Sequence, residues 1–329
     1  MSPASGRLAI YLLKSSDNQI PEKVNKFRLH HEGCRSFVIA ANIHILTNKL
    51  MTRGRQVVNL TSSVYRSIPQ RRSCSNSNGL GTFDVLGVPV SAITLTSAIA
   101  LVGSWIGRSE RPKLATFTNV HMLTESHLRP EIHTLLKKSD LNCPDGMPLV
   151  WIGKLRLRRL TQVCGTEFME KFCAATAEAD FRHFFYGGAE GVALSVISEL
   201  QVRHRSLKIA GSFSPPFRKL TCEEDEQIVQ HINDSGADVI WVSLGCPKQE
   251  IWMYEHRDRL RASVILSVGQ AFDILAGVKR RVPVNMRSLG LEWLYRAFQE
   301  PKRLLCRYVT SNPVFLFLLL MALFKKSNR

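Results

Sequence analysis

Four polar side chains stand at the sequence positions where enzymes of the α/β class place catalytic groups. Asn119, Gln249 and Asp273 each follow a short apolar run, and Asp145 lies in a Pro-Asp-Gly turn. A carboxylate held between proline and glycine is either a turn residue that bonds its own backbone or a general base. Because loops at the carboxyl ends of parallel strands share one edge of a sheet, we expect the four groups on one rim, and together they are a stronger indication of a site than any one of them.

A glycine-rich loop is the second feature that could form a binding site. Gly187, Gly188 and Gly191 separate an apolar run from a helical segment, and glycines there let backbone N–H groups approach a phosphate closely. Their order is Gly-Gly-x-x-Gly rather than Gly-x-Gly-x-x-Gly, and no acidic residue follows a second strand to hold a ribose. A tight turn without a ligand therefore remains an equal alternative to nucleotide binding.

The elements that would position these groups follow from the hydrophobic pattern. Short apolar runs alternate with segments of helical period, which predicts an α/β domain with a mainly parallel sheet over 83–278. The expected strands are 83–88, 114–118, 183–186, 207–212, 239–244 and 264–268. The expected helices are 95–106, 131–138, 166–179, 191–203, 222–233 and 249–259. The acidic run 223–226 opens one of them and is interpreted as helix capping rather than a metal site.

Charge is distributed unevenly along the 329 residues, which carry a net charge of +17. Residues 1–82 hold 12 Lys/Arg against 3 Asp/Glu, and 279–329 hold 11 against 2, whereas the segment between them is close to neutral. Basic ends of this kind meet nucleic acid, anionic lipid or a phosphorylated ligand. The eight cysteines form no Cys-x-x-Cys pair and do not alternate with histidine at ligand spacing, which favours reduced thiols in the cytosol over disulfides or zinc.

The first 82 residues are expected to form a basic, disordered extension outside the fold. The segment 61–82 is rich in Ser, Asn and Arg without a hydrophobic period, and the apolar stretch 37–46 begins too late for a secretory signal. Met51 is a candidate for the true start of translation.

The basic C-terminal segment, 279–329, is expected to be a helical appendage. Its apolar run 314–324 covers roughly 16 Å as a helix, about half of a bilayer core. Arginines precede this run and two lysines follow it, a pattern typical of attachment at a membrane surface. A buried C-terminal helix is the alternative. We expect a cytoplasmic protein, peripheral on the inner face of the cell membrane.

Five sequence blocks together resemble the WecG/TagA/CpsF family of bacterial glycosyltransferases. The blocks occur in order over roughly 83–310, and the first 82 residues have no counterpart. They are PDGMPLVW (144–151), FFYGGAEG (184–191), LGCPKQEIWM (244–253), SVGQAFDILAG (267–277) and LGLEWLYRAFQEPKRLLCRYV (289–309).

The resemblance implies a Rossmann-like domain with a C-terminal membrane-associating appendage. The implied reaction is inverting transfer from a UDP-sugar to a polyprenyl-diphosphate-linked acceptor in exopolysaccharide, capsule or teichoic-acid-like assembly. By the same analogy Asp145 is the base, Asn119 and Gln249 are active-site polar groups, and Asp273 contacts the nucleotide. The glycine loop of Gly187, Gly188 and Gly191 is then expected to bind the nucleotide sugar. Arg296, Arg303 and Arg307 would bind the lipid diphosphate.

One position departs from the family pattern. The family carries Thr-x-Asn before this strand end, but Phe117 occupies the threonine position, and only a local bulge would let Thr118 replace it. The chain also contains no Asp-x-Asp, so we expect no metal and no cofactor. An NAD-dependent nucleotide-sugar oxidoreductase or epimerase and a nucleic-acid-binding protein are the competing classes, and neither has its motif here. The donor sugar (N-acetylmannosamine, its uronic acid, glucose or glucuronic acid), the acceptor glycan and the existence of a homo-oligomer stay open.

Overall fold

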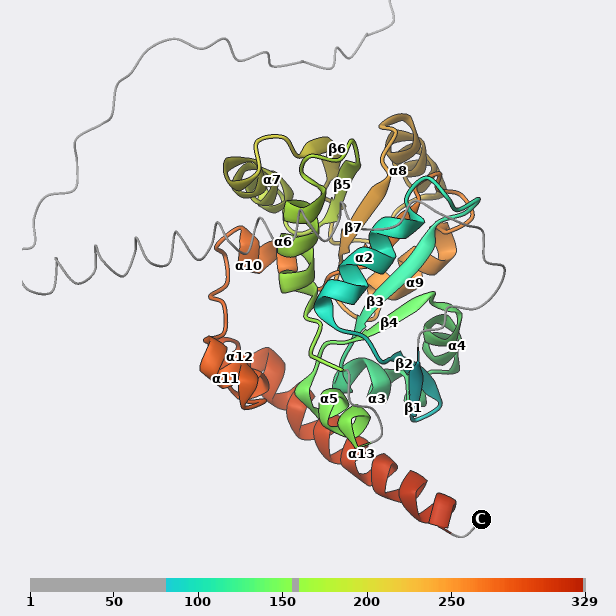
Figure 1. Cartoon of the computed structure of the whole chain (residues 1–329), viewed down its shortest axis with the longest axis vertical. Helices are drawn as coiled ribbons and strands as arrows, with labels where there is room; N and C mark the ends of the chain where they lie inside the picture. Colours follow the sequence, from blue (N-terminus) through green and yellow to red (C-terminus); the bar gives the residue numbers. More distant parts are fainter. Residues whose placement is uncertain (1–80, 156–159, 328–329) are drawn as a thin grey trace, which may run out of the picture. The chain divides into compact units, whose positions relative to one another are not determined.

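A six-stranded parallel sheet forms the centre of the fold in the computed structural model (Figure 1), which describes residues 81–155 and 160–327. All of these residues belong to the second of the chain's two units, Arg53–Arg329. The strand order is β4-β3-β8-β7-β5-β6, and every neighbouring pair is parallel. The strands are β3 (Lys113–Thr118), β4 (Leu141–Pro144), β5 (Arg182–Gly187), β6 (Lys208–Phe213), β7 (Val239–Ser243) and β8 (Val264–Ser267). The predicted α/β fold with a mainly parallel sheet is confirmed.

Helices cover both faces of the sheet because its buried strands present apolar side chains to both sides. One face packs against α2 (Leu95–Trp105), α6 (Gly165–Thr176), α7 (Val192–Arg203) and α10 (Ala271–Leu275). The other face packs against α8 (Cys222–Asp234) and α9 (Lys248–His256). The acidic run that opens α8 does cap it, because Thr221 and Glu224 form a reciprocal capping box.

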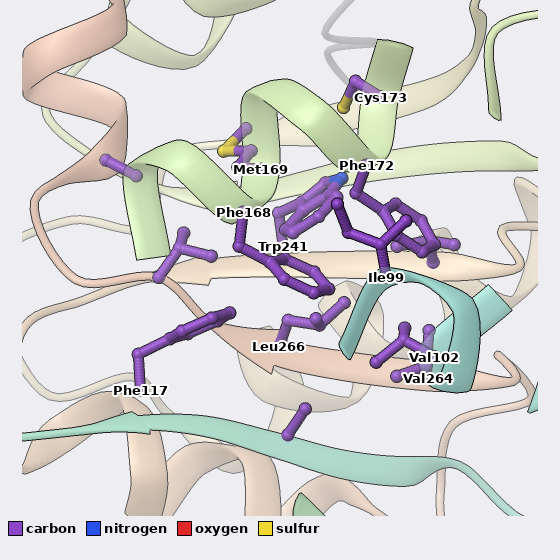
Figure 2. Packing of buried hydrophobic residues seen from close by; sticks show 14 of the residues in the cluster. Ile99, Val102, Phe117, Phe168, Met169, Phe172, Cys173, Trp241, Val264 and Leu266 are labelled. Atoms are coloured by element: carbon purple, nitrogen blue, oxygen red, sulfur yellow. The ribbon is translucent and has the colours of Figure 1, made fainter. Parts of the chain in front are cut away.

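Aromatic side chains fill the first of these two cores. Figure 2 shows Phe168 and Phe172 of α6 directed toward Trp241 of β7, with side chains of α2 alongside. The ring of Phe172 meets that of Trp241 edge-on, with 5.7 Å between centroids. The indole Nε1 of Trp241 donates to Nδ1 of the buried His183 at 3.1 Å, so the polar atom of this large side chain is satisfied within the core.

One predicted strand was wrong. The run 83–88 is an antiparallel hairpin, β1 (Thr82–Val85) and β2 (Val88–Ser91), outside the six-stranded sheet. Leu86 and Gly87 both have positive φ, 56° and 84°, which turns the chain back on itself within the apolar run. The hairpin packs with α3 (Val120–Leu128), α4 (Pro130–Lys138) and α5 (Met147–Lys154) in a third apolar cluster.

The C-terminal segment is helical, as expected. It comprises α11 (Val284–Ser288), α12 (Glu292–Gln299) and the long α13 (Pro301–Ser327), drawn in orange to red in Figure 1. Helix α13 packs along α3, where the Thr124 hydroxyl donates to the Ser311 carbonyl at 3.4 Å, and Phe315 is buried in the hairpin cluster. Within 81–155 and 160–327, none of the helices combines the length and the apolar content that crossing a membrane requires.

Candidate functional site

A cavity of about 560 Å³ opens at the carboxyl ends of four adjacent strands, β4, β3, β8 and β7. The loop after each of these strands contributes to its wall, and the appendage helices α12 and α13 supply the opposite wall. The polar lining residues include Asn119, Asp145, Gln162, Gln249, Gln270, Glu292, Arg296 and Tyr308. Three of the four polar residues that the sequence singled out as catalytic candidates, Asn119, Asp145 and Gln249, therefore share one cavity.

Asp145 is fixed by its main chain, and its carboxyl group, which interacts with the Cys164 thiol, keeps one oxygen available. Its N–H donates to the Thr118 carbonyl at 2.9 Å, and its own carbonyl accepts from Nε2 of Gln162 at 2.8 Å. Within the described residues, its buried Oδ1 has no hydrogen-bond partner. Burial and then the neighbouring Glu292 carboxylate raise the pKa of Asp145 to about 8, while the Arg296 guanidinium opposes them. A carboxyl group with this pKa is mostly protonated at neutral pH and becomes a base as it ionises toward pH 8, with a vacant oxygen for the incoming proton.

Asn119 has a structural role and a free amide group on the same side chain. It is the N-cap of α3, and its Oδ1 accepts from the N–H of Met122 at 3.1 Å. With Oδ1 engaged in this cap, the donors of the Asn119 NH2 group have no hydrogen-bond partner among the described residues and are available to a ligand.

Gln249 connects two of the loops at the cavity. Its Oε1 accepts from the N–H of Gly269 after β8, at 3.2 Å, and its Nε2 donates to Oε1 of Glu250 at 2.7 Å. Burial raises the pKa of Glu250, which lies below the cavity surface. The side chain is thus held in one orientation, with one amide hydrogen left for a ligand.

The family model described as "Glycosyl transferase WecG/TagA/CpsF family" matches residues 83–329. The chain belongs to this family. It is therefore a glycosyltransferase of cell-surface polysaccharide synthesis, with a sugar donor and an acceptor as its substrates.

The glycosyltransferase brings only part of the expected arginine set into its described cavity. Arg296 of α12 lines the cavity and pairs with Glu292 one turn earlier. Arg303 and Arg307 fall on α13, but their side chains lie outside the described residues.

Thr118 lies away from the cavity. Its side chain is fully buried within the sheet, 3.2 Å from the Thr116 hydroxyl, which in turn donates to Oδ1 of Asn142 at 2.7 Å. Strand β3 pairs with β4 without a register shift, so there is no bulge to turn Thr118 toward a ligand. Phe117 lines the cavity instead.

The glycine loop and Asp273 also lie outside the cavity lining. Gly187 is at the end of β5, where an added Cβ would come within 2.4 Å of the Ser243 carbonyl oxygen, so a close contact between strands already requires glycine there. Asp273 of α10 forms an ion pair with Lys279 at 2.7 Å, and Lys279 reaches Glu300 at 3.0 Å. This carboxylate connects the α/β core with the appendage.

Sequence reasoning missed two polar residues beside Asp145. Glu292 is part of the GLEW block that carried the resemblance, so its position was visible, although its role was not. Gln162 follows a run of basic residues and had no signal of its own. Among the described residues no group of three or more His, Cys, Asp or Glu is placed to hold a metal ion.

Proposed function

We propose that this glycosyltransferase transfers a sugar, with inversion, from a UDP-sugar to a hydroxyl of a polyprenyl-diphosphate-linked acceptor. The product would be an intermediate of exopolysaccharide, capsule or teichoic-acid-like assembly. The observation that carries the proposal is Asp145: a fixed loop, a vacant buried oxygen and a raised pKa in one cavity wall.

The geometry suits a single displacement. The acceptor oxygen attacks the anomeric carbon as its proton passes to Oδ1 of Asp145, and the bond from the anomeric carbon to the diphosphate oxygen breaks with its electron pair leaving on UDP. One base is enough for this step, because the nucleophile and the leaving group occupy opposite faces of the sugar. Asn119 and Gln249, each with a donor left over, would orient the sugar and the acceptor.

Negative charge that develops on the departing diphosphate needs fixed positive charge or N–H donors nearby. Among the described residues that line the cavity, Arg296 is the only permanent cation. We assign it to diphosphate binding together with Arg303 and Arg307, which follow on α13. The absence of Asp-x-Asp from the sequence supports a reaction that these groups carry out without a metal.

The nucleoside of the donor would extend from the cavity along the sheet. Strand β5 is the neighbour of β7, so a ligand that leaves the cavity past Gly245 next meets the loop of Gly187, Gly188 and Gly191. We propose this loop and Asp273 as the far end of the donor site.

The surface of α13 supports attachment to the inner face of the cell membrane. Leu316, Phe317, Leu320 and Met321 are 45–61% exposed and recur at helical spacing on one side of the helix. Lys325 and Lys326 follow directly in the sequence. Apolar side chains next to lysines favour the interface of an anionic bilayer, which is where a lipid-linked acceptor is found.

The test is a donor screen with a short-chain lipid-diphosphate sugar, in which UDP release and the anomeric configuration of the product are measured. We expect one UDP-sugar to support turnover with inversion. Asp145→Asn should reduce turnover at least about 1,000-fold and leave UDP-sugar binding nearly unchanged. Asp258→Asn, at an exposed site, is the matched control. Near-normal turnover in Asp145→Asn would refute the assignment of the base, and retention of configuration would refute the single displacement.

A further inference from the structure

A chain of hydrogen bonds joins the loop of Asp145 to helix α12. Nε2 of Gln162 donates to the Asp145 carbonyl at 2.8 Å and lies 3.4 Å from Oε2 of Glu292. The other carboxylate oxygen of Glu292 accepts from Nη2 of Arg296, one helical turn further along. All four residues line the cavity, and the side chains of Glu292 and Arg296 are only 17% and 24% exposed.

Glu292 is poorly placed to act as the base itself. Both of its carboxylate oxygens already accept hydrogen bonds, one from an arginine. In the described structure, Oδ1 of Asp145 has no such partner. The two carboxyl groups are therefore not equivalent: one is available to a substrate, and the other is held in place next to it.

The charged and titratable groups around Asp145 are four side chains from three parts of the chain. The Cys164 thiol precedes α6, the Cys143 thiol is on β4, and Glu292 and Arg296 are on α12. Both thiols are buried, and burial raises the pKa of each, so they remain neutral at physiological pH. The charges that act on Asp145 are therefore those of Glu292, which favours its protonated form, and Arg296, which favours its ionised form.

We propose that Glu292 is the positioning residue of the general base: it holds the Asp145 loop through Gln162 and keeps a second negative charge next to the carboxyl group. The inference rests on the proposed role of Asp145. If Glu292 has this role, helix α12 of the appendage takes part in the acid–base chemistry, although it lies about 150 residues after Asp145 in the sequence.

The pH dependence of kcat/KM separates this role from a structural one. In the wild type we expect kcat/KM to rise with pH and to level off above about pH 8, where Asp145 is ionised. Glu292→Gln retains an oxygen that can accept a hydrogen bond but removes the charge, so the rise should occur about one pH unit lower. Arg296→Gln removes the opposing charge, so the rise should occur about one pH unit higher.

Glu300→Gln is the matched control, because Glu300 is an acidic residue of the same appendage whose partner is Lys279. The Glu300→Gln variant should show the same pH dependence of kcat/KM as the wild type. Gln162→Leu removes the connection but no charge, so we expect a lower kcat with the profile unshifted. Thermal unfolding of each variant shows which of them are folded.

Opposite shifts from Glu292→Gln and Arg296→Gln support the inference, because general damage to the fold would not reverse sign. Profiles that superimpose on the wild type in both variants would overturn it. If Asp145→Asn is inactive and the profiles still superimpose, only the role of Glu292 fails. If Asp145→Asn is active, the proposed base itself fails.

Discussion

Asp145 should destabilise the folded protein at the pH at which it works. An unfolded chain gives this carboxyl group a pKa near 3.8, whereas the fold raises it to about 8. Between these values the folded state keeps a proton that the unfolded state releases, so the free energy of unfolding falls as pH rises from about 4 to about 8. Below pH 4 both states are protonated, and no penalty remains.

The size of this effect follows from the same two values. At about 1.4 kcal/mol for each pKa unit, complete ionisation at pH 8.5 would destabilise the fold by at most about 6 kcal/mol. Asp145 is only partly buried and its cavity admits water, so we expect about half of this, ~3 kcal/mol. Asp145→Asn removes the ionisation and should therefore be inactive but more stable than the wild type at pH 8.5, with little difference at pH 4.5.

Urea unfolding of both proteins at pH 4.5, 6.5 and 8.5 measures the difference directly. The control is Asp140→Asn. Oδ2 of Asp140 is 2.6 Å from Nη2 of the buried Arg257, and Oδ1 of Asp140 is 2.9 Å from Nζ of Lys113. Removing the charge of this paired carboxylate should therefore destabilise the fold by about 3 kcal/mol at pH 8.5. An Asp145→Asn protein that is no more stable than the wild type at pH 8.5, or whose gain is the same at every pH, would refute the reasoning.

Two further predictions concern the sheet and the appendage. Gly187→Ala should lower the free energy of unfolding, measured in urea, by about 3 kcal/mol, because φ is +115° and the new Cβ would lie 2.4 Å from a carbonyl oxygen. Gly107→Ala is the control: φ is +71° and nothing lies within 4 Å, so its free energy of unfolding should fall by only about 1 kcal/mol. Phe317→Glu with Leu320→Glu should weaken binding to anionic vesicles at least about tenfold in a flotation assay, whereas Phe217→Glu, also at an exposed phenylalanine, should not. Unchanged flotation of the double variant would argue against the proposed membrane-binding face.

The strands that could be predicted are those whose sequence carries a short run of apolar side chains. Strand β7 has four buried residues in succession, so its run is continuous in the sequence. Strand β4 was missed because it is four residues long and contains Asn142 and a proline. The Asn142 side chain is buried and accepts from Thr116, and it donates to the Pro89 and Leu136 carbonyls at 2.9 and 2.8 Å. A polar residue satisfied by such distant partners looks like a loop residue in the sequence.

The candidate site was predictable as far as the strand ends and no further. Asn119, Asp145 and Gln249 come together because each follows the carboxyl end of a strand. Gly187 is the last residue of a strand and yet lies outside the cavity lining, because the order of strands in the sheet depends on tertiary packing that local pattern does not encode. Glu292 reaches Asp145 from a helix beyond the sheet, and only the folded chain shows that contact.

The instability that Asp145 introduces explains why its surroundings are so extensively hydrogen-bonded. A carboxyl group is basic here because burial and Glu292 oppose its ionisation, and the same opposition weakens the fold. The loop keeps its position because the Thr118 carbonyl and Gln162 hold its main chain, while Gln249 joins the neighbouring loops. None of these bonds uses the carboxyl oxygens of Asp145 itself. Stability is thus supplied through the backbone, and the side chain is left with a vacant oxygen, which is the condition for accepting a proton from a substrate.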